Sequence, residues 1–186
     1  MGATLVRNFT GSATNLPTMT RSERERLFQE LFAANRSRIQ RLCYGYLGSS
    51  GEVEDLFQEI MINVWNSLPS FRGESLASTW LYRIAVNTAL IHRRKRRPTE
   101  PLPELRDPSR GAQQNLETEE RLAALRAAIA TLPDQDRLIL TLLLEGLSYK
   151  EISEITGLTV NHVGVKINRS KAVLEELLTE AHHGAL

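Results

Sequence analysis

Residues 52–68 read EVEDLFQEIMINVWNSL, and this stretch decides the fold class. Its apolar side chains recur at intervals of three and four, which places them along one side of an α-helix. They are Val53, Leu56, Phe57, Ile60, Val64 and Leu68. The same spacing recurs before and after this stretch, and no segment alternates with the period of two that marks a strand. The sequence therefore predicts an all-α protein.

Two more helices are predicted around this one. Upstream, apolar residues between positions 27 and 47 indicate one long or broken helix, and the segment 48–51 (GSSG) is expected to be a turn. Downstream, Pro69 and the loop 71–75 precede a third helix, whose inner stripe is Ala77, Leu81, Ile84, Ala85 and Thr88. We expect these helices to form a small domain over residues 22–97, after a flexible N-terminal tail over 1–21.

A break follows the third helix. Residues 98–111 contain four prolines, each of which lacks a backbone donor and opposes a continuous helix. We therefore expect a flexible linker over 98–114, a second small helical domain over 115–180, and a short tail over 181–186.

The second domain is expected to hold four helices. The first carries Leu122, Leu125, Ile129 and Leu132, and Pro133 with Asp134 starts the next, which ends at Gly146. Ser148 and Glu151 form a capping box that opens a short third helix. Gly157 then turns the chain into a final helix with the inner stripe Val160, Val163, Ile167 and Leu174. A short helix, a glycine-containing turn and a longer helix together predict a helix-turn-helix.

Composition excludes several classes of protein. The 186 residues hold 23 Lys and Arg against 22 Asp and Glu, so the whole-chain charge of +1 indicates no polyanion partner. Cys43 is the single cysteine, which excludes an internal disulfide and is interpreted as a small core residue. No apolar run is long enough for a signal peptide or a membrane span, so we expect a cytoplasmic protein. We find no nucleophile–base pair, phosphate-binding glycine loop or metal-ligand cluster, and we expect neither catalysis, nor a cofactor, nor a metal, nor a small-molecule substrate.

Local charge is more informative than the total. Between Arg72 and Arg97 lie seven Lys or Arg and one acid, a net of +6. Such a cluster at the end of a helix can complement the helix dipole. Five consecutive cations, from Arg93 to Arg97, exceed what a dipole needs, and contact with phosphates explains them better.

The polar face of the third helix points to nucleic acid as well. Thr79, Arg83, Asn87 and Arg94 follow one another at near-helical spacing, opposite the apolar stripe. Trp80 borders both faces. It can stack on a base, as binding of single-stranded or melted DNA requires, or it can belong to the core.

The helix over 52–68 has the opposite charge. Glu52, Glu54, Asp55 and Glu59 give it −4 within eight residues, with Gln58 among them. This face would repel DNA, so it predicts either a protein partner with a basic surface or simple exposure to solvent.

The final helix carries residue types that read duplex DNA. Asn161, His162, Val165, Lys166 and Arg169 face away from its apolar stripe. Lys166 and Arg169 suit phosphates or guanine edges, Asn161 suits adenine, and Val165 suits a thymine methyl group. A recognition helix presents such a set to the major groove.

Five segments resemble one family of bacterial proteins. Residues 54–59 (EDLFQE), 70–75 (SFRGES) and 79–87 (TWLYRIAVN) resemble region 2 of the extracytoplasmic-function (ECF) subfamily of the sigma-70 family. Residues 132–134 (LPD) and 146–152 (GLSYKEI) resemble region 4 of the same sigma factors. The segments occur in the expected order, on either side of the linker.

The resemblance implies a transcription initiation factor that binds core RNA polymerase and directs it to specific promoters. Asp55, Gln58 and Glu59 would face the clamp helices of the largest polymerase subunit, and the flap would be a second contact. The loop at Arg72–Ser75 and the helix carrying Thr79, Trp80, Arg83, Asn87, Arg93 and Arg94 would read and trap the melted −10 element. The final helix would read the −35 element in duplex form. The resemblance also implies restraint by an anti-sigma factor.

The chain departs from the family at one place. Members commonly carry a Lys and a small polar residue where this chain has Gly164 and Val165, so one phosphate contact is lost. Two other readings compete with the sigma factor. A stand-alone helix-turn-helix regulator would explain the second domain but not the acidic face. A polymerase-binding adaptor would keep that face without initiating transcription.

Overall fold

The computed structural model describes residues 19–48, 50–95 and 116–183, and these residues form helices without a strand. In order they are α1 (Arg21–Leu47), α2 (Ser50–Ser67), the short 3₁₀ helix η1 (Leu68–Ser70), α3 (Ala77–Lys95), α4 (Leu116–Thr131), α5 (Asp134–Leu144), α6 (Tyr149–Thr156) and α7 (Val160–His183). The predicted linker over 98–114 and most of the predicted N-terminal tail lie outside the described residues.

Helix α1 is one continuous helix with defined ends. Thr20 and Glu23 form a capping box, in which the Glu23 carboxylate accepts from the Thr20 amide at 2.9 Å. Gly48 ends the helix with a φ of 74°, in the left-handed region that favours glycine. Helix α2 begins already at Ser50. The prediction that Ser50 and Gly51 belong to the turn was therefore wrong.

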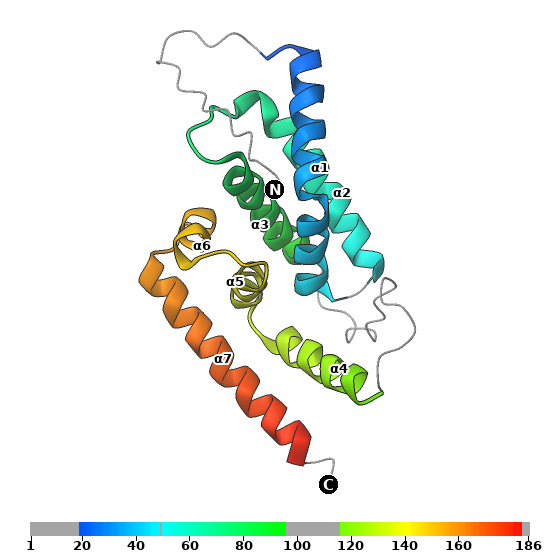
Figure 1. Cartoon of the computed structure of the whole chain (residues 1–186), viewed down its shortest axis with the longest axis vertical. Helices are drawn as coiled ribbons and strands as arrows, with labels where there is room; N and C mark the ends of the chain where they lie inside the picture. The colour runs from blue at the N-terminus through cyan, green and yellow to red at the C-terminus, as the bar shows by residue number, and fades with distance from the viewer. Residues whose placement is uncertain (1–18, 49, 96–115, 184–186) are drawn as a thin grey trace, which may run out of the picture.

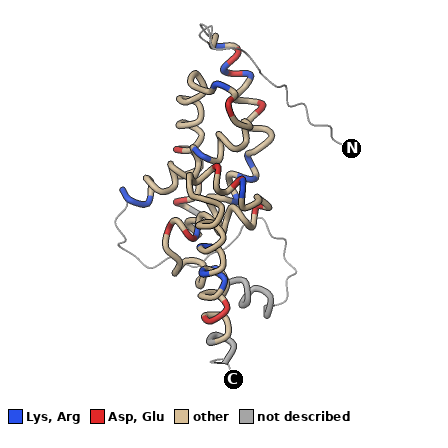
Figure 2. Tube along the Cα trace, turned by 90° about the vertical axis from the view of Figure 1, so that its left-hand side faces the viewer, with Lys and Arg blue, Asp and Glu red and all other residues tan. Residues whose placement is uncertain are grey.

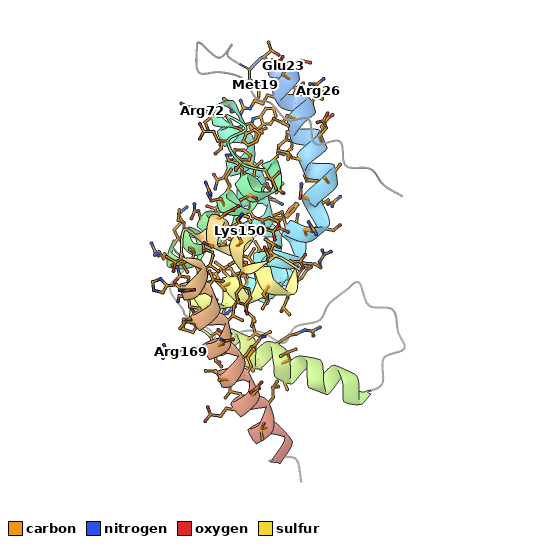
Figure 3. All side chains as sticks on the ribbon, turned by 60° about the vertical axis from the view of Figure 1, so that its left-hand side comes forward. Met19, Glu23, Arg26, Arg72, Lys150 and Arg169 are labelled. Carbon is orange, nitrogen blue, oxygen red and sulfur yellow. The ribbon has the colours of Figure 1, made fainter. Side chains whose placement is uncertain are left out.

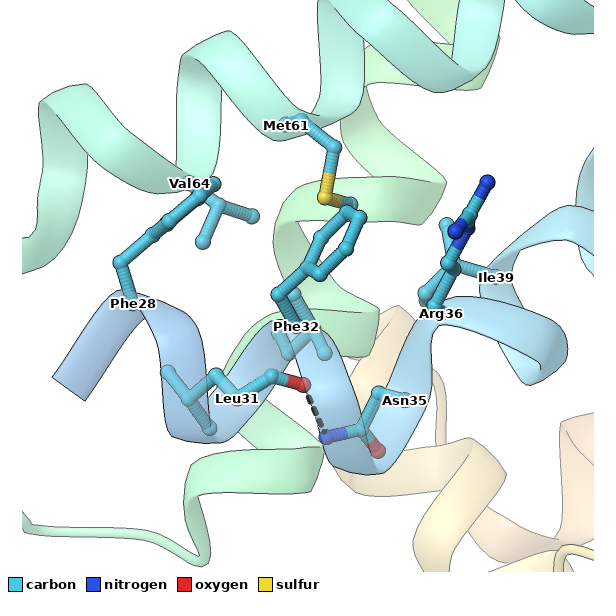
Figure 4. A pocket seen from close by; sticks show the side chains of 9 residues that line it. Phe28, Leu31, Phe32, Asn35, Arg36, Ile39, Met61 and Val64 are labelled. Carbon is cyan, nitrogen blue, oxygen red and sulfur yellow. Dashed lines mark hydrogen bonds between the residues drawn. The ribbon is translucent and has the colours of Figure 1, made fainter. Parts of the chain in front are cut away.

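Helices α1, α2 and α3 pack together as the upper bundle of Figure 1. The six apolar residues predicted from the period of α2 are all buried, the last of them in η1. Arg24 holds the start of α1 to the end of α2, since its guanidinium donates to the Trp65 carbonyl and lies 4.0 Å from the centre of the indole ring. A small apolar pocket remains between α1 and α2, and Figure 4 shows Phe32 and Met61 converging over it.

The remaining helices carry the predicted helix-turn-helix. Ser148 and Glu151 make the predicted capping box at the start of α6, and Gly157 ends that helix with a φ of 75°. Helix α7 extends to His183, so residues 181–183 are helical and not part of a tail as predicted. A small core of Ala128, Leu132, Leu140 and Leu174 joins α4, α5 and α7.

The two groups of helices are not separate in this structure. Helix α5 packs against α1, and α6 packs against α3, as Figure 1 shows. One cluster of buried side chains runs from Ile39 and Leu42 of α1 through α2 and α3 to Leu138 and Ile152 of α5 and α6. Cys43 lies in this cluster, and burial raises the pKa of its thiol to about 12, which fits the predicted core role.

Candidate nucleic-acid interface

The loop before α3 is held by two aromatic rings. Phe71 and Trp80 lie with their ring centres 4.9 Å apart at an angle of 48°, and the Trp80 amide donates to the Leu76 carbonyl at 3.0 Å. Gly73 has a φ of 71° and allows the loop to turn between them. Trp80 is half-buried and packs against the main core. The core interpretation of Trp80 is therefore correct in part, and base stacking by this partly exposed residue stays a prediction.

Sequence patterns missed one residue of this loop. Leu76 is 58% exposed, although large apolar residues are usually buried, and it lies between Ser75 and the start of α3. Arg72 is exposed and Ser75 is half-exposed. The loop therefore presents a cation, a hydroxyl and an apolar side chain together.

The polar face of α3 is only partly as predicted. Asn87 and Arg94 are exposed, but Thr79 is 5% exposed and does not belong to that face. Helix α3 packs against α1, α2 and α6, so its buried surface is wider than the single stripe that periodicity indicated. This corrects the assignment of Thr79 as a DNA-contacting residue.

Two arginines of α3 contact the second group of helices. The Arg83 guanidinium donates to the Glu154 carbonyl of α6 at 2.8 and 3.2 Å. Arg93 pairs with Asp134 at the start of α5, at 2.8 Å. The cations at the end of α3 lie at the margin of the molecule in Figure 2.

The residues of α2 predicted to contact the polymerase are Asp55, Gln58 and Glu59. Asp55 and Gln58 are exposed. Glu59 instead bridges to α3, where it accepts from Nδ1 of His92 at 2.8 Å and from Nζ of Lys95 at 3.2 Å. The hydrogen bond from His92 is the main reason that the pKa of Glu59 lies below its ordinary value. Ile62, 58% exposed one turn further along α2, was missed because its position follows no apolar stripe.

Glu59→Gln is expected to lower the free energy of unfolding by about 0.5–1 kcal/mol at neutral pH, since solvent screens these partly exposed pairs. The lowered pKa means that the native state holds this proton less tightly than the unfolded chain does. The contribution of Glu59 is therefore complete above its ordinary pKa of 4.5 and is lost as the pH falls through the native-state value. Urea unfolding at pH 7 and pH 3.5 should show the difference between parent and variant shrinking in acid. A constant difference would contradict this role.

The predicted recognition helix α7 displays most of its expected residues. Asn161, His162 and Arg169 are exposed, and Val165 is 64% exposed. The Thr159 hydroxyl accepts from the His162 amide at 3.3 Å and caps the start of the helix. Figure 3 shows Arg169 on α7, with Lys150 of α6 and Arg72 of the loop successively further along the molecule.

Two residues of α7 differ from expectation. Val160, the first residue of the helix, is exposed, although the apolar stripe had placed it inside. Lys166 is half-buried and pairs with Asp136 of α5 at 2.5 Å. The Lys166 ammonium group therefore holds α7 to α5. Nearby on the same helix, Asn168 is exposed.

Gly164→Ala is expected to stabilise the protein by about 1 kcal/mol, because glycine is the poorer helix former by that amount. An added Cβ would lie 3.6 Å from the Tyr149 ring, an ordinary contact distance. Gly157→Ala is the matched comparison and should destabilise, since its φ of 75° strains any other residue. Urea unfolding of both variants tests this, and a loss of stability in Gly164→Ala would show that α7 and Tyr149 cannot accept the methyl group.

Two further features of the described residues bear on function. None of the helices in this part of the chain has the length and apolar character needed to cross a membrane. Among the same residues, no three His, Cys, Asp or Glu side chains gather as a metal site. The described surfaces are thus a loop with a basic helix, an acidic helix face, and a helix-turn-helix.

Comparison with known proteins agrees with these surfaces. The Sigma-70 region 2 family matches residues 31–99, and the Sigma-70 region 4 family matches residues 122–174. The ECF RNA polymerase sigma-E factor of Escherichia coli K12 is 34% identical over 165 residues, which cover 81% of this chain and 86% of the relative. The sigma-E factor of Haemophilus influenzae is 34% identical over 167 residues, covering 81% and 87%. The chain belongs to the ECF sigma factors, a family of transcription initiation factors.

Solved structures share the fold. CnrH in complex with the cytosolic domain of CnrY superposes with a TM-score of 0.64 at 23% identity, over 84% of this chain and 90% of CnrH. The sigma factor RpoE of Bartonella quintana, in complex with the anti-sigma factor NepR, gives a TM-score of 0.67 at 21% identity, over 83% and 98%.

Proposed function

We propose that this chain binds core RNA polymerase and directs it to promoters with three surfaces. Asp55, Gln58 and Glu59 face the clamp helices of the largest subunit, and the second group of helices meets the flap. Exposure of Asp55 and Gln58 on one face of α2 supports the first contact. The polymerase-binding and −10-binding domain spans residues 22–97, and the −35-binding domain spans 115–180.

The −10 element is read by the loop and the exposed part of α3. Arg72, Ser75, Arg83, Asn87, Arg93 and Arg94 supply hydrogen bonds and positive charge, and the accessible part of Trp80 supplies a stacking surface. The −35 element is read by Asn161, His162, Val165 and Arg169 on α7. The observation that carries this proposal is the presence, in one chain of this family, of exposed polar residues on both α3 and α7.

The remaining parts of the proposal follow from the family. The factor acts in the cytoplasm, where its polymerase is, and performs no chemistry of its own. An anti-sigma factor restrains it, and the structure of the similar factor RpoE in complex with the anti-sigma factor NepR supports this part of the proposal.

Run-off transcription with purified core polymerase and a pool of genomic promoter fragments tests the function. Discrete new transcripts that depend on the protein and share −35 and −10 elements are expected. Arg169→Ala should reduce these transcripts while leaving binding to core polymerase intact, because Arg169 is proposed to contact only DNA. Polymerase binding without transcripts would favour an adaptor. Absence of polymerase binding would instead favour the stand-alone helix-turn-helix regulator.

A further inference from the structure

Helix α3 carries an apolar side chain in the middle of its exposed face. Ile91 is 48% exposed, whereas its neighbours Leu90 and His92 pack against the core or are buried. Residues three and four apart lie on the same side of a helix, so Ile91 lies between Asn87 and Arg94. Both of these polar residues are exposed. Ile91 therefore sits among the residues proposed to bind −10 DNA, although it was not predicted to be one of them.

The same side of α3 leads back to the loop that precedes the helix. With 3.6 residues per turn, Trp80, Asn87 and Ile91 lie within about 40° of one another around the helix axis. Trp80 contacts Phe71 of the loop, and its ring is partly exposed. A single row of partly or fully exposed side chains therefore runs from the proposed stacking surface, past Asn87, to Ile91 and the cations at the end of the helix.

The charge around Ile91 indicates what binds there. Single exposed apolar residues are common on protein surfaces, so exposure alone assigns no role. Helix α3, however, contains no Asp or Glu, and its last turn carries His92, Arg93, Arg94 and Lys95. This end of α3 lies at the margin of the molecule in Figure 2. A ligand for this face should combine negative charge with an apolar group. DNA does so, because its phosphates are anionic and thymine presents a C5 methyl group in the major groove.

We propose that Ile91 is a specificity-determining residue, whose side chain contacts the C5 methyl group of one thymine in the −10 region. Contacts from cations to phosphates hold DNA without distinguishing its sequence, so an apolar contact to a base adds information that Arg94 and Lys95 do not supply. The proposal rests on the proposed function and assigns to α3 a preference for thymine at one position.

The length of α3 limits where this thymine can lie. Ile91 is eleven residues beyond Trp80, which is about 16 Å along the axis of an α-helix. Successive nucleotides of one DNA strand are about 3.4 Å apart along the duplex axis. For DNA that follows the row of exposed side chains, the thymine at Ile91 lies about five nucleotides from the base that stacks on Trp80.

Replacement of single thymines by deoxyuridine tests the proposal, because uracil differs from thymine only by the missing methyl group. The full-length protein is bound to core polymerase, and competition binding is measured on a promoter found by run-off transcription, with each thymine of the −10 region replaced in turn. We expect binding to weaken about fourfold at one thymine, the effect of exposing one buried methyl group. Ile91→Ala should bind the thymine promoter about fourfold less tightly and should not distinguish thymine from uracil at that position.

Two further variants serve as controls. Ile91→Val keeps a branched apolar side chain and should retain a smaller preference for thymine at the same position. Leu144→Ala removes an apolar side chain that is 70% exposed at the end of α5, outside the residues proposed to bind DNA. It should keep the full fourfold preference. Urea unfolding should give Ile91→Ala the midpoint of the parent protein, since a substitution at an exposed site changes stability little.

The outcomes separate this inference from the proposed function. An Ile91→Ala variant as sensitive to uracil as the parent would overturn the inference and leave promoter binding intact. A parent protein insensitive to uracil at every thymine would overturn it too, and would favour an acidic protein partner for this face. If Ile91→Ala failed to fold, an undiminished preference in Ile91→Val would overturn it. Absence of protein-dependent promoter binding by the unmodified protein would instead mean that the proposed function had failed, together with the inference that rests on it.

Discussion

Arg137→Met is expected to lower the free energy of unfolding by about 3 kcal/mol, with methionine filling most of the space but replacing none of the donors. Arg137 is 2% exposed. Its guanidinium donates to the carbonyls of Ile129, Ala130 and Leu132 at the end of α4, and to that of Tyr46 near the end of α1. The C-terminal ends of two helices carry partial negative charge, so a cation between them is stabilising. Without it, these carbonyls stay buried with fewer partners.

Urea unfolding followed by circular dichroism measures this loss, with the midpoint and slope fitted together. Arg169→Met is the control, since the same substitution at an exposed site should change stability by no more than about 0.5 kcal/mol. Equal midpoints for the two variants would show that water replaces the guanidinium at little cost, and that Arg137 does not organise the ends of α1 and α4.

Asn87→Ala is expected to lower open-complex formation about tenfold, the size of effect that the loss of one base contact produces. Asn87 is exposed on α3, one turn beyond Arg83, and its amide can both donate to and accept from a base edge. Asn87 is a cleaner test than Arg83, because Arg83 also donates to the Glu154 carbonyl. Removing Arg83 would change both DNA binding and the contact between α3 and α6. Stability should not fall, because alanine is the better helix former.

Permanganate reactivity of melted thymines, measured beside run-off yield, reports open complexes directly. Gln29→Ala removes an exposed amide from α1, a helix with none of the residues proposed to contact DNA, and serves as the control. Unchanged thymine reactivity in Asn87→Ala, at equal binding of core polymerase, would remove Asn87 from the −10 surface.

Elements set by local chemistry could be predicted from the sequence. The six-residue stripe starting at Val53 is buried throughout, and the capping box of Ser148 and Glu151 forms as expected. The exposed residues Asn161, Val165 and Arg169 follow from the stripe on the opposite side of α7. In each case the residues that decide the outcome are neighbours on one helix.

Features that depend on distant residues could not be predicted in this way. Arg83 and Glu154 are 71 positions apart, and Arg41 and Glu145 are 104 apart. Thr79 has the polarity of a surface residue, but α3 packs on more than one side and buries it. Lys166 and Glu59 likewise lie on the faces expected, yet each is paired with a neighbouring helix, which periodicity within one helix does not reveal.

The placement of the two tryptophans allows the protein to be followed by its intrinsic fluorescence. Trp65 and Trp80 are the only ones in the sequence, so α4 to α7 contribute no indole emission. Trp65 is packed edge-on to Phe28, with ring centres 5.4 Å apart, under the Arg24 guanidinium. Trp80 lies instead at the loop beside Phe71. A change in emission when a single strand of −10 DNA is added, and its loss in a Trp80→Phe variant, would therefore report occupancy of that loop in an unlabelled sample.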